Sequence, residues 1–584
     1  MKFRNIRNMA VVSGLALALA GPGTALANKD AEENALGETV AASSLSGSFL
    51  AGQVAAKGND DEAAVAFYER SVELDPENDQ IKRLLFLALA ANGRIEDAVK
   101  LARENNQIPD EATFTRLVVA VDLLKNKSWN NVSETLDSPA GTELDKLVEK
   151  LVVAWSHFGS GETAKALEMA SEIDGPEWVV AIRNYHSGLM SAAIGNDEAA
   201  IPFFKKATED RAMAGVLTSA YMRALEALAL AQQRSGEQDE ALKTLRSGQD
   251  LLSNHPPFKH LLAEFGAGKT LPPLVTSAQQ GGAEIFYNVG SALSQQGGAP
   301  FAQSHLQLAR FLHPKSDAIA VSLAGLFEKQ KKHARANQYY ETIEPESAYF
   351  RRSQLEYALN LNDLDQSDKA IEILSALIES DPNELLAYLT LGSVHAQKEE
   401  YDKAAVIYDD AVSRVDIPEQ EHWNLFYRRG IAYERTKQWE KAEPNFKKSL
   451  ELMPNQPDVL NYLGYSWIDM GINLDEGMEM IRKAVELKPR SGFIVDSLGW
   501  AHYKLGNYPE AVKELERAVN LMPEDPVVND HLGDAYWKVG RKLEATFQWN
   551  HALASKPTPE DRMKIQAKLK NGLTEEEATT ASGQ

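Results

Sequence analysis

The chain has 584 residues, more than one hydrophobic core usually serves, so we expect several domains or an array of repeats. Its formal net charge of −23 argues against a nucleic-acid-binding protein, because phosphates are held by clustered Lys and Arg, and no basic cluster stands out after the first residues. It contains no cysteine, which excludes disulfides, thiolate catalysis, cysteine-bound zinc and the lipobox cysteine of a lipoprotein.

Residues 1–27 have the order of a secretory signal peptide. Basic residues precede an apolar run over residues 9–20, and small residues lead up to Ala27, after which we expect cleavage. The alternative, a membrane anchor, is disfavoured because the run is shorter than the ~20 residues that a spanning helix needs. Residues 28–44 are polar and acidic, which indicates a flexible leader. These features predict a periplasmic protein that is not a lipoprotein.

One pattern occurs twice in tandem near the end of the chain, with a period of 34 residues. The first copy consists of Gly499, Ala511, Leu515, Ala518 and Pro523, and the second of Gly533, Ala545, Trp549, Ala552 and Pro557. This period is typical of a helix-turn-helix repeat. The glycine lets a second helix cross closely, and the small, large, small stripe at i, i+4 and i+7 forms the matching face of that helix. Proline then ends each pair.

The same pattern can be followed backwards through the chain and gives about 14 repeats over residues 45–557. An N-terminal array covers residues 45–264 and begins with Gly52, Ala64 and Tyr68. Residues 265–283 are rich in glycine and proline, and we interpret them as an irregular connecting loop between two subarrays, or less favourably as a binding insertion.

The second part of the pattern is a C-terminal array over residues 284–557, which restarts at Gly290. Residues 558–573 are expected to form a capping helix through Met563, Ile565, Ala567 and Leu569, covering the last repeat. The tail 574–584 is acidic and is predicted to be disordered.

The small residues at fixed places, the large residue between them and the final proline resemble the tetratricopeptide repeat. This resemblance implies an all-α fold, an α-solenoid in the form of a right-handed superhelix. The two subarrays would be hinged near residues 265–283.

Motifs that carry chemistry are weak in this chain. The string AEFGAGKT at residues 263–270 has alanine where a phosphate-binding loop needs its first glycine, no strand precedes it, and two prolines follow where a helix should begin. The histidines are scattered without a His-Glu-x-x-His pair, and there is no Gly-x-Ser-x-Gly elbow. We therefore expect no enzyme activity, no cofactor and no metal site.

A set of aromatic and polar residues recurs on the first helices of the last repeats, one step beyond the packing face. From the repeat family, such positions are expected to line the concave side of the superhelix, where they would suit an extended peptide or a partner helix. The predicted partner-binding residues are Tyr427, Asn461, Tyr465, Asp496, Trp500, Tyr503, Asp530, Asp534 and Trp537. The alternative for each tryptophan is a place in the core.

The strings NYLGYSW, DSLGWAHYKLG and HLGDAYWKVGRKLEA are similar to those of long, exported tetratricopeptide repeat proteins of Gram-negative bacteria. That group includes lipoprotein adaptors that bring cell-wall hydrolases to a carboxyl-terminal processing protease. The resemblance implies a non-enzymatic adaptor with protein partners, without nucleic acid and with at most peripheral membrane association. The alternative is a structural or assembly factor for envelope biogenesis or polysaccharide export, and an enzyme comes third.

Overall fold

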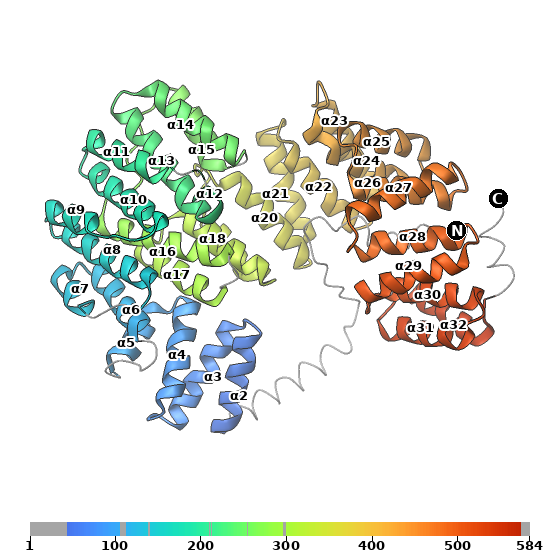
Figure 1. Cartoon of the computed structure of the whole chain (residues 1–584), viewed down its shortest axis with the longest axis horizontal. Helices are drawn as coiled ribbons and strands as arrows, with labels where there is room; N and C mark the ends of the chain where they lie inside the picture. Colours follow the sequence, from blue (N-terminus) through green and yellow to red (C-terminus); the bar gives the residue numbers. More distant parts are fainter. Residues whose placement is uncertain are drawn as a thin grey trace. The chain divides into compact units, whose positions relative to one another are not determined.

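In a computed structural model, the described residues are 44–104, 112–137, 141–209, 211, 213–253, 255–295 and 299–573. The predicted signal peptide, residues 28–43 of the leader and the tail 574–584 lie outside these ranges. Within them every regular element is helical, which confirms the all-α prediction. The described residues form two compact units, an N-terminal unit that ends at Ala370 and a C-terminal unit that starts at Ile371 (Figure 1).

The N-terminal unit is built from pairs of consecutive helices. Its first helices are α2 (Leu45–Lys57), α4 (Asp79–Asn92), α6 (Ala112–Lys125), α8 (Glu143–Gly159), α10 (Glu177–Ala193), α13 (Thr218–Arg234), α16 (Ala278–Gln295), α18 (Asp317–Lys329) and α20 (Phe350–Asp363). Its second helices are α3 (Asp61–Leu74), α5 (Ile95–Glu104), α7 (Trp129–Thr135), α9 (Thr163–Ser171), α11 (Asp197–Ala207), α14 (Gln238–Leu251), α17 (Ala299–Leu312) and α19 (His333–Tyr340). Two further helices, α12 (Met213–Val216) and α15 (Pro256–Gly266), stand between pairs, and α21 (Ser367–Ser380) contains the division between the units.

The C-terminal unit continues the same alternation. Its first helices are α22 (Leu385–Gln397), α24 (Trp423–Arg435), α26 (Pro457–Asp469), α28 (Gly492–Lys504) and α30 (Pro526–Lys538). Its second helices are α23 (Tyr401–Ser413), α25 (Trp439–Leu452), α27 (Leu474–Leu487), α29 (Tyr508–Leu521) and α31 (Lys542–Ala554), with a short 3-10 turn, η2 (Gln420–His422), before α24. A last helix, α32 (Pro559–Asn571), packs against α31 at the predicted place of the capping helix.

The glycine of each clear repeat lies against the large residue of its own second helix, as the pattern predicts. A Cβ on Gly499 would lie 2.6 Å from Leu515 Cγ, and one on Gly533 would lie 2.5 Å from Trp549 Cδ1. Tyr68 fills the same place against Gly52. The alanines on either side, such as Ala511 and Ala518, are fully buried. The large side chain occupies the space that a Cβ would need. The glycine of the repeat pattern therefore marks the point where the two helices cross closely.

The N-terminal unit closes on itself in a way that the repeat pattern does not predict. Helix α16 packs against α6 and α8, and α17 packs against α4 and α6, so helices far apart in sequence lie side by side (Figure 1). Gly281 of α16 lies against the Trp155 ring of α8, and Gly282 lies against Leu124 of α6. Both glycines were assigned to the irregular loop from sequence, whereas the structure places them inside α16, at a crossing too close for a Cβ.

Polar contacts complete this closure. The Gln303 amide of α17 donates to Asp61 Oδ2 at 2.8 Å and to the Ala91 carbonyl oxygen at 2.8 Å. Lys332 Nζ lies 2.9 Å from Asp61 Oδ2, and Arg335 donates to the Asn92 carbonyl oxygen at 2.9 Å. The start of the unit is therefore held by side chains that follow it by more than two hundred residues.

The predicted connecting loop, residues 265–283, is helical at both ends, and only residues 267–277 lie between α15 and α16. This stretch is tied to α13, because Gln233 donates to the Lys269 carbonyl oxygen at 2.6 Å and Arg234 donates to the Leu271 carbonyl oxygen at 3.3 Å. Val275 within it is buried. The loop thus lies inside the N-terminal unit, and the division between compact units comes later, at residues 370–371.

Candidate protein-binding site

The nine predicted partner-binding residues all lie in the C-terminal unit, on α24, α26, α28 and α30. Three of them, Trp500, Asp530 and Trp537, are partly exposed. The other six are buried and are Tyr427, Asn461, Tyr465, Asp496, Tyr503 and Asp534. The positions that the sequence places beyond the packing stripe therefore also take part in packing, because successive first helices from α24 to α30 contact each other as well as their own partners.

Polar and aromatic contacts join successive first helices through these residues. The Tyr427 and Tyr462 rings meet edge to face with centroids 6.0 Å apart. The Asn461 amide donates to Ser497 Oγ at 3.3 Å. Asp496 Oδ1 lies 3.0 Å from His531 Nδ1, and both side chains are buried. Burial acts to lower the pKa of His531, but the Asp496 carboxylate raises it above its ordinary value, which favours a charged imidazolium in this pair.

Trp500 is held in an aromatic stack. Its ring lies parallel to Tyr503 with centroids 4.6 Å apart and to His531 with centroids 3.9 Å apart. The stack fixes the indole while leaving part of it exposed to solvent. Trp500 therefore combines the two properties of an interface anchor, a rigid aromatic side chain and an accessible surface.

The three predicted residues of the last repeat are in contact with α32 and the residue that follows it. Lys568 Nζ lies 2.8 Å from Asp530 Oδ2 and 2.7 Å from Asp534 Oδ2. Gly572, just after α32, lies against the Trp537 ring. Burial raises the pKa of Asp534 to about 6, although Lys568 acts to lower it. This face of the last repeat is thus covered within the described chain.

The side chains by which α32 packs differ from the predicted set. Ile565 is buried and Leu569 is partly buried, as expected, but Met563 is 65% exposed and Ala567 is exposed. Lys568 of this helix points toward α30 instead, because its ammonium pairs there with the carboxylates of Asp530 and Asp534. An apolar stripe alone could not indicate this charge-driven orientation.

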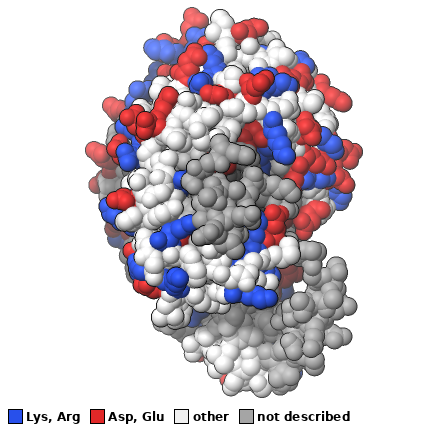
Figure 2. Space-filling view, turned by 90° about the vertical axis from the view of Figure 1, so that its right-hand side faces the viewer, with Lys and Arg blue, Asp and Glu red and all other residues white. Residues whose placement is uncertain are grey.

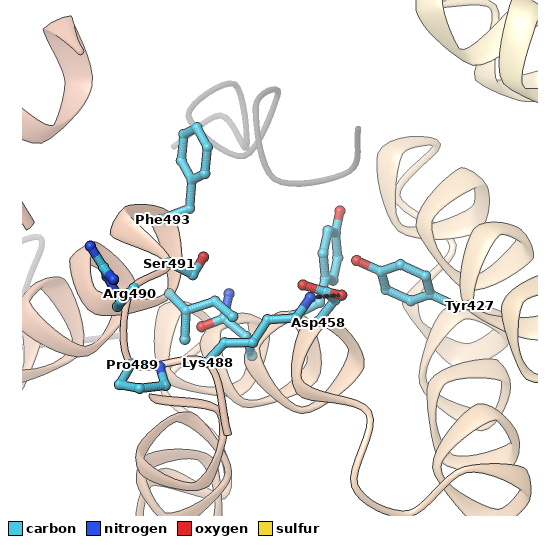
Figure 3. A pocket seen from close by; sticks show the side chains of 10 residues that line it. Tyr427, Asp458, Lys488, Pro489, Arg490, Ser491 and Phe493 are labelled. Carbon is cyan, nitrogen blue, oxygen red and sulfur yellow. Dashed lines mark hydrogen bonds and ion pairs between the residues drawn. The ribbon is translucent and has the colours of Figure 1, made fainter. Parts of the chain in front are cut away.

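A pocket of about 440 Å³ brings two of the predicted residues, Tyr427 and Asn461, together with residues that the sequence does not predict as partner-binding (Figure 3). Its wall comes from α24, α26, the connection between α27 and α28, and the start of α28. The additional lining residues are Asp458, Tyr462, Lys488, Pro489, Arg490, Ser491, Phe493 and Ile494. The signal that could have revealed them is the basic string Lys488-Pro489-Arg490 in an acidic chain.

Acidic and basic side chains are interspersed over the face shown in Figure 2. Across the described ranges, no group of His, Asp and Glu is arranged to hold a metal ion. In the part of the chain that the structure describes, no helix is both long enough and apolar enough to span a bilayer.

Comparison with known proteins identifies the repeats. Tetratricopeptide repeat models match residues 47–78, 355–422 and 423–456, and a TPR repeat model matches residues 499–540. The chain therefore contains tetratricopeptide repeats near both of its ends, and this repeat type forms protein-binding scaffolds.

Among curated proteins, the chain is similar to TPR repeat-containing protein PA4667 of Pseudomonas aeruginosa, with 28% identity over 33% of this chain and 32% of that protein. It is also similar to anaphase-promoting complex subunit 3 of Schizosaccharomyces pombe, with 27% identity over 17% of this chain and 14% of that protein. The chain thus matches about a third or less of the length of these relatives. Among solved structures, the crystal structure of the APC/C hetero-tetramer Cut9-Hcn1 aligns with 15% identity and a TM-score of 0.38, over 94% of this chain and 99% of that one.

Proposed function

We propose that this chain is a non-enzymatic adaptor of the bacterial cell envelope whose C-terminal repeats, residues 423–557, hold a protein partner. The observation that carries the proposal is Trp500, whose indole is fixed in an aromatic stack and is still partly exposed. The same unit keeps an open pocket beside Tyr427. Accessible aromatic side chains on a rigid framework are what a protein interface uses as anchors.

The partner class that the sequence resemblance supports is a periplasmic protease together with the envelope proteins delivered to it, such as cell-wall hydrolases. The second candidate is a structural or assembly factor for envelope biogenesis or polysaccharide export. The identity of the recovered protein separates them, because an adaptor would bring down a protease and its substrates, and an assembly factor would bring down synthases or export channels.

Substitution of Trp500 by alanine is expected to reduce partner recovery from envelope extract by about thirtyfold, because an interface aromatic commonly contributes about 2 kcal/mol. Partner recovery and thermal unfolding are measured on the same full-length variants. Trp439→Ala is the matched control, since Trp439 is also partly buried but lies on the second helix α25.

Retained folding with lost recovery for Trp500→Ala, and normal recovery for Trp439→Ala, would support the binding face. Equal recovery by all variants would contradict it. If Trp500→Ala unfolds the unit, Trp500→Phe is used instead. Phenylalanine retains an aromatic ring in the stack but lacks part of the indole, so a change in partner recovery still reports on this surface.

Export is the second part of the proposal, and it rests on the order of residues 1–27. The protein purified from its native source is expected to begin at Asn28. Amino-terminal sequencing measures this directly. An intact Met1 would contradict cleavage and would favour a cytoplasmic or membrane-tethered protein.

A further inference from the structure

The pocket beside Tyr427 combines aromatic walls with a basic rim. Tyr427, Tyr462 and Ile494 are buried side chains of its wall, and Phe493 is partly exposed (Figure 3). Its volume of about 440 Å³ is that of a small-molecule site, so it admits one or two side chains of a peptide and excludes a whole helix.

The basic rim is held in place by the fold. Lys488 Nζ lies 2.8 Å from Asp458 Oδ2, so this ion pair joins the connection before α28 to α26. The Arg517 guanidinium donates to the Pro489 carbonyl oxygen and thereby fixes the backbone next to Arg490. Arg490 itself is exposed and forms no ion pair with any described residue. An unpaired arginine on a fixed backbone beside an apolar wall can bind an anion such as a carboxylate.

The charge of this connection distinguishes it from those that precede other first helices of the same unit. The connections before α22, α24 and α30 carry Asp381 and Glu384, Asp416 and Glu419, and Glu524 and Asp525, respectively, whereas the one before α28 reads Lys488-Pro489-Arg490-Ser491. At physiological salt, charges interact over about 8 Å, so these local cations outweigh the net negative charge of distant parts of the chain. The pocket is therefore a locally basic site on an acidic protein.

From these observations we propose that the pocket binds a peptide segment in which an aromatic or large apolar side chain stands next to a carboxylate. The apolar side chain enters between Tyr427, Tyr462 and Phe493, and the carboxylate pairs with the guanidinium of Arg490, which can bind both oxygens at once. Ser491, the N-cap of α28, makes no hydrogen bond from its side chain to the helix and so remains available to the same carboxylate. The inference rests on the proposed function and names the ligand class of one of its sites.

The carboxylate has two possible sources, the carboxyl terminus of a chain and an internal Asp or Glu. Three fluorescein-labelled peptides distinguish them by anisotropy with the full-length protein. The first is Ser-Gly-Ser-Ala-Phe with a free carboxyl terminus, the second is the same peptide amidated, and the third is amidated Ser-Asp-Phe-Ser-Gly. We expect the first or the third to bind at least tenfold more tightly than the second, and the preferred one identifies the source.

Variants locate the binding. Arg490→Ala is expected to weaken the preferred peptide at least tenfold and Arg490→Glu to abolish binding, while Arg490→Lys keeps part of the affinity. Arg482→Ala is the matched control, because Arg482 is an exposed arginine on the neighbouring helix α27. Phe493→Ser is expected to weaken binding of the preferred peptide without altering thermal unfolding, since Phe493 is partly exposed.

The inference is overturned if none of the peptides binds below 1 mM, if the amidated peptide without an acid binds as tightly as the others, or if Arg490→Ala leaves the dissociation constant unchanged. The outcome is separable from that of the proposed function. Lost partner recovery by Trp500→Ala with no peptide binding would overturn the pocket and keep the adaptor, whereas peptide binding that depends on Arg490 without any partner recovery would keep the pocket and contradict the adaptor.

Discussion

Replacement of Arg223 by methionine is expected to lower the free energy of unfolding of the N-terminal unit by about 3 to 5 kcal/mol, the usual cost of removing one partner of a buried ion pair. Arg223 Nη1 lies 2.8 Å from Glu226 Oε2, and its Nε donates to Glu284 Oε2 at 3.3 Å. Glu226 is 2% exposed and Glu284 is 5% exposed, so methionine would leave two carboxylates in the interior without their shared cation.

The network around Arg223 favours the ionised form of Glu226. Burial acts to raise the pKa of Glu226, but Arg223 and His255 together hold that pKa below its ordinary value. The Tyr185 hydroxyl donates to Glu284 Oε2 at 2.9 Å. These bonds join α10, α13 and His255, the residue just before α15, to α16, the helix that closes the unit. Loss of Arg223 is thus expected to weaken the packing of α16 against the earlier helices of the unit, and not only one helix pair.

Urea unfolding with hydrogen exchange read over α13 and α16 measures this effect without contributions from the C-terminal unit. The matched control is Arg246→Met, because Arg246 is exposed on α14. The triple variant Arg223→Met, Glu226→Gln, Glu284→Gln removes the uncompensated charges and should recover most of the lost stability. A loss of less than about 1 kcal/mol for Arg223→Met, in the range of a surface ion pair, would show that the site is solvated.

The repeat architecture could be predicted from the sequence because it depends on local spacing. A glycine and the large residue 16 positions later lie on adjacent helices of one pair, and the structure confirms the contact for Gly52, Gly188, Gly430, Gly499 and Gly533. Even the residue inserted after Gly464 is confirmed, because that glycine lies against Ile481 one position later. Such contacts span fewer than twenty residues, so one period of the pattern contains both partners.

The closure of the N-terminal unit could not be predicted in the same way. Gly281 and Gly282 have the composition of a loop, and only the presence of Trp155 and Leu124, more than a hundred residues earlier, makes them helix-crossing residues. The candidate site shows the same limit. Tyr427 and Asn461, which the sequence predicts on one face, both line the pocket. Lys488 and Arg490 reach it from the connection between α27 and α28, where the repeat pattern includes only Pro489. Whether the nine residues bind a partner stays a prediction.

Substitution of Lys568 by methionine is expected to destabilise the end of the C-terminal unit by about 3 kcal/mol, because it leaves Asp530 and Asp534 facing each other without a cation. The side chain of Lys568 is 11% exposed, and those of Asp530 and Asp534 are 19% and 7% exposed. Burial acts to lower the pKa of Lys568, but the two carboxylates raise it above its ordinary value, so the ammonium is favoured in the folded chain. The ion pairs of Lys568 with Asp530 and Asp534 therefore hold α32 on α30 at neutral pH.

Hydrogen exchange of α30 and α32, together with urea unfolding followed by the fluorescence of Trp537, measures this loss. Lys570→Met is the matched control, because Lys570 lies exposed on the same helix. Adding Asp530→Asn and Asp534→Asn to Lys568→Met should restore much of the protection, since no buried charge then remains. If Lys568→Met and Lys570→Met behave alike, α32 is held by Ile565 and Leu569 alone. A released α32 would expose Trp537 and the acidic pair, so partner recovery by Lys568→Met also reports whether the last repeat can bind once its own chain has left it.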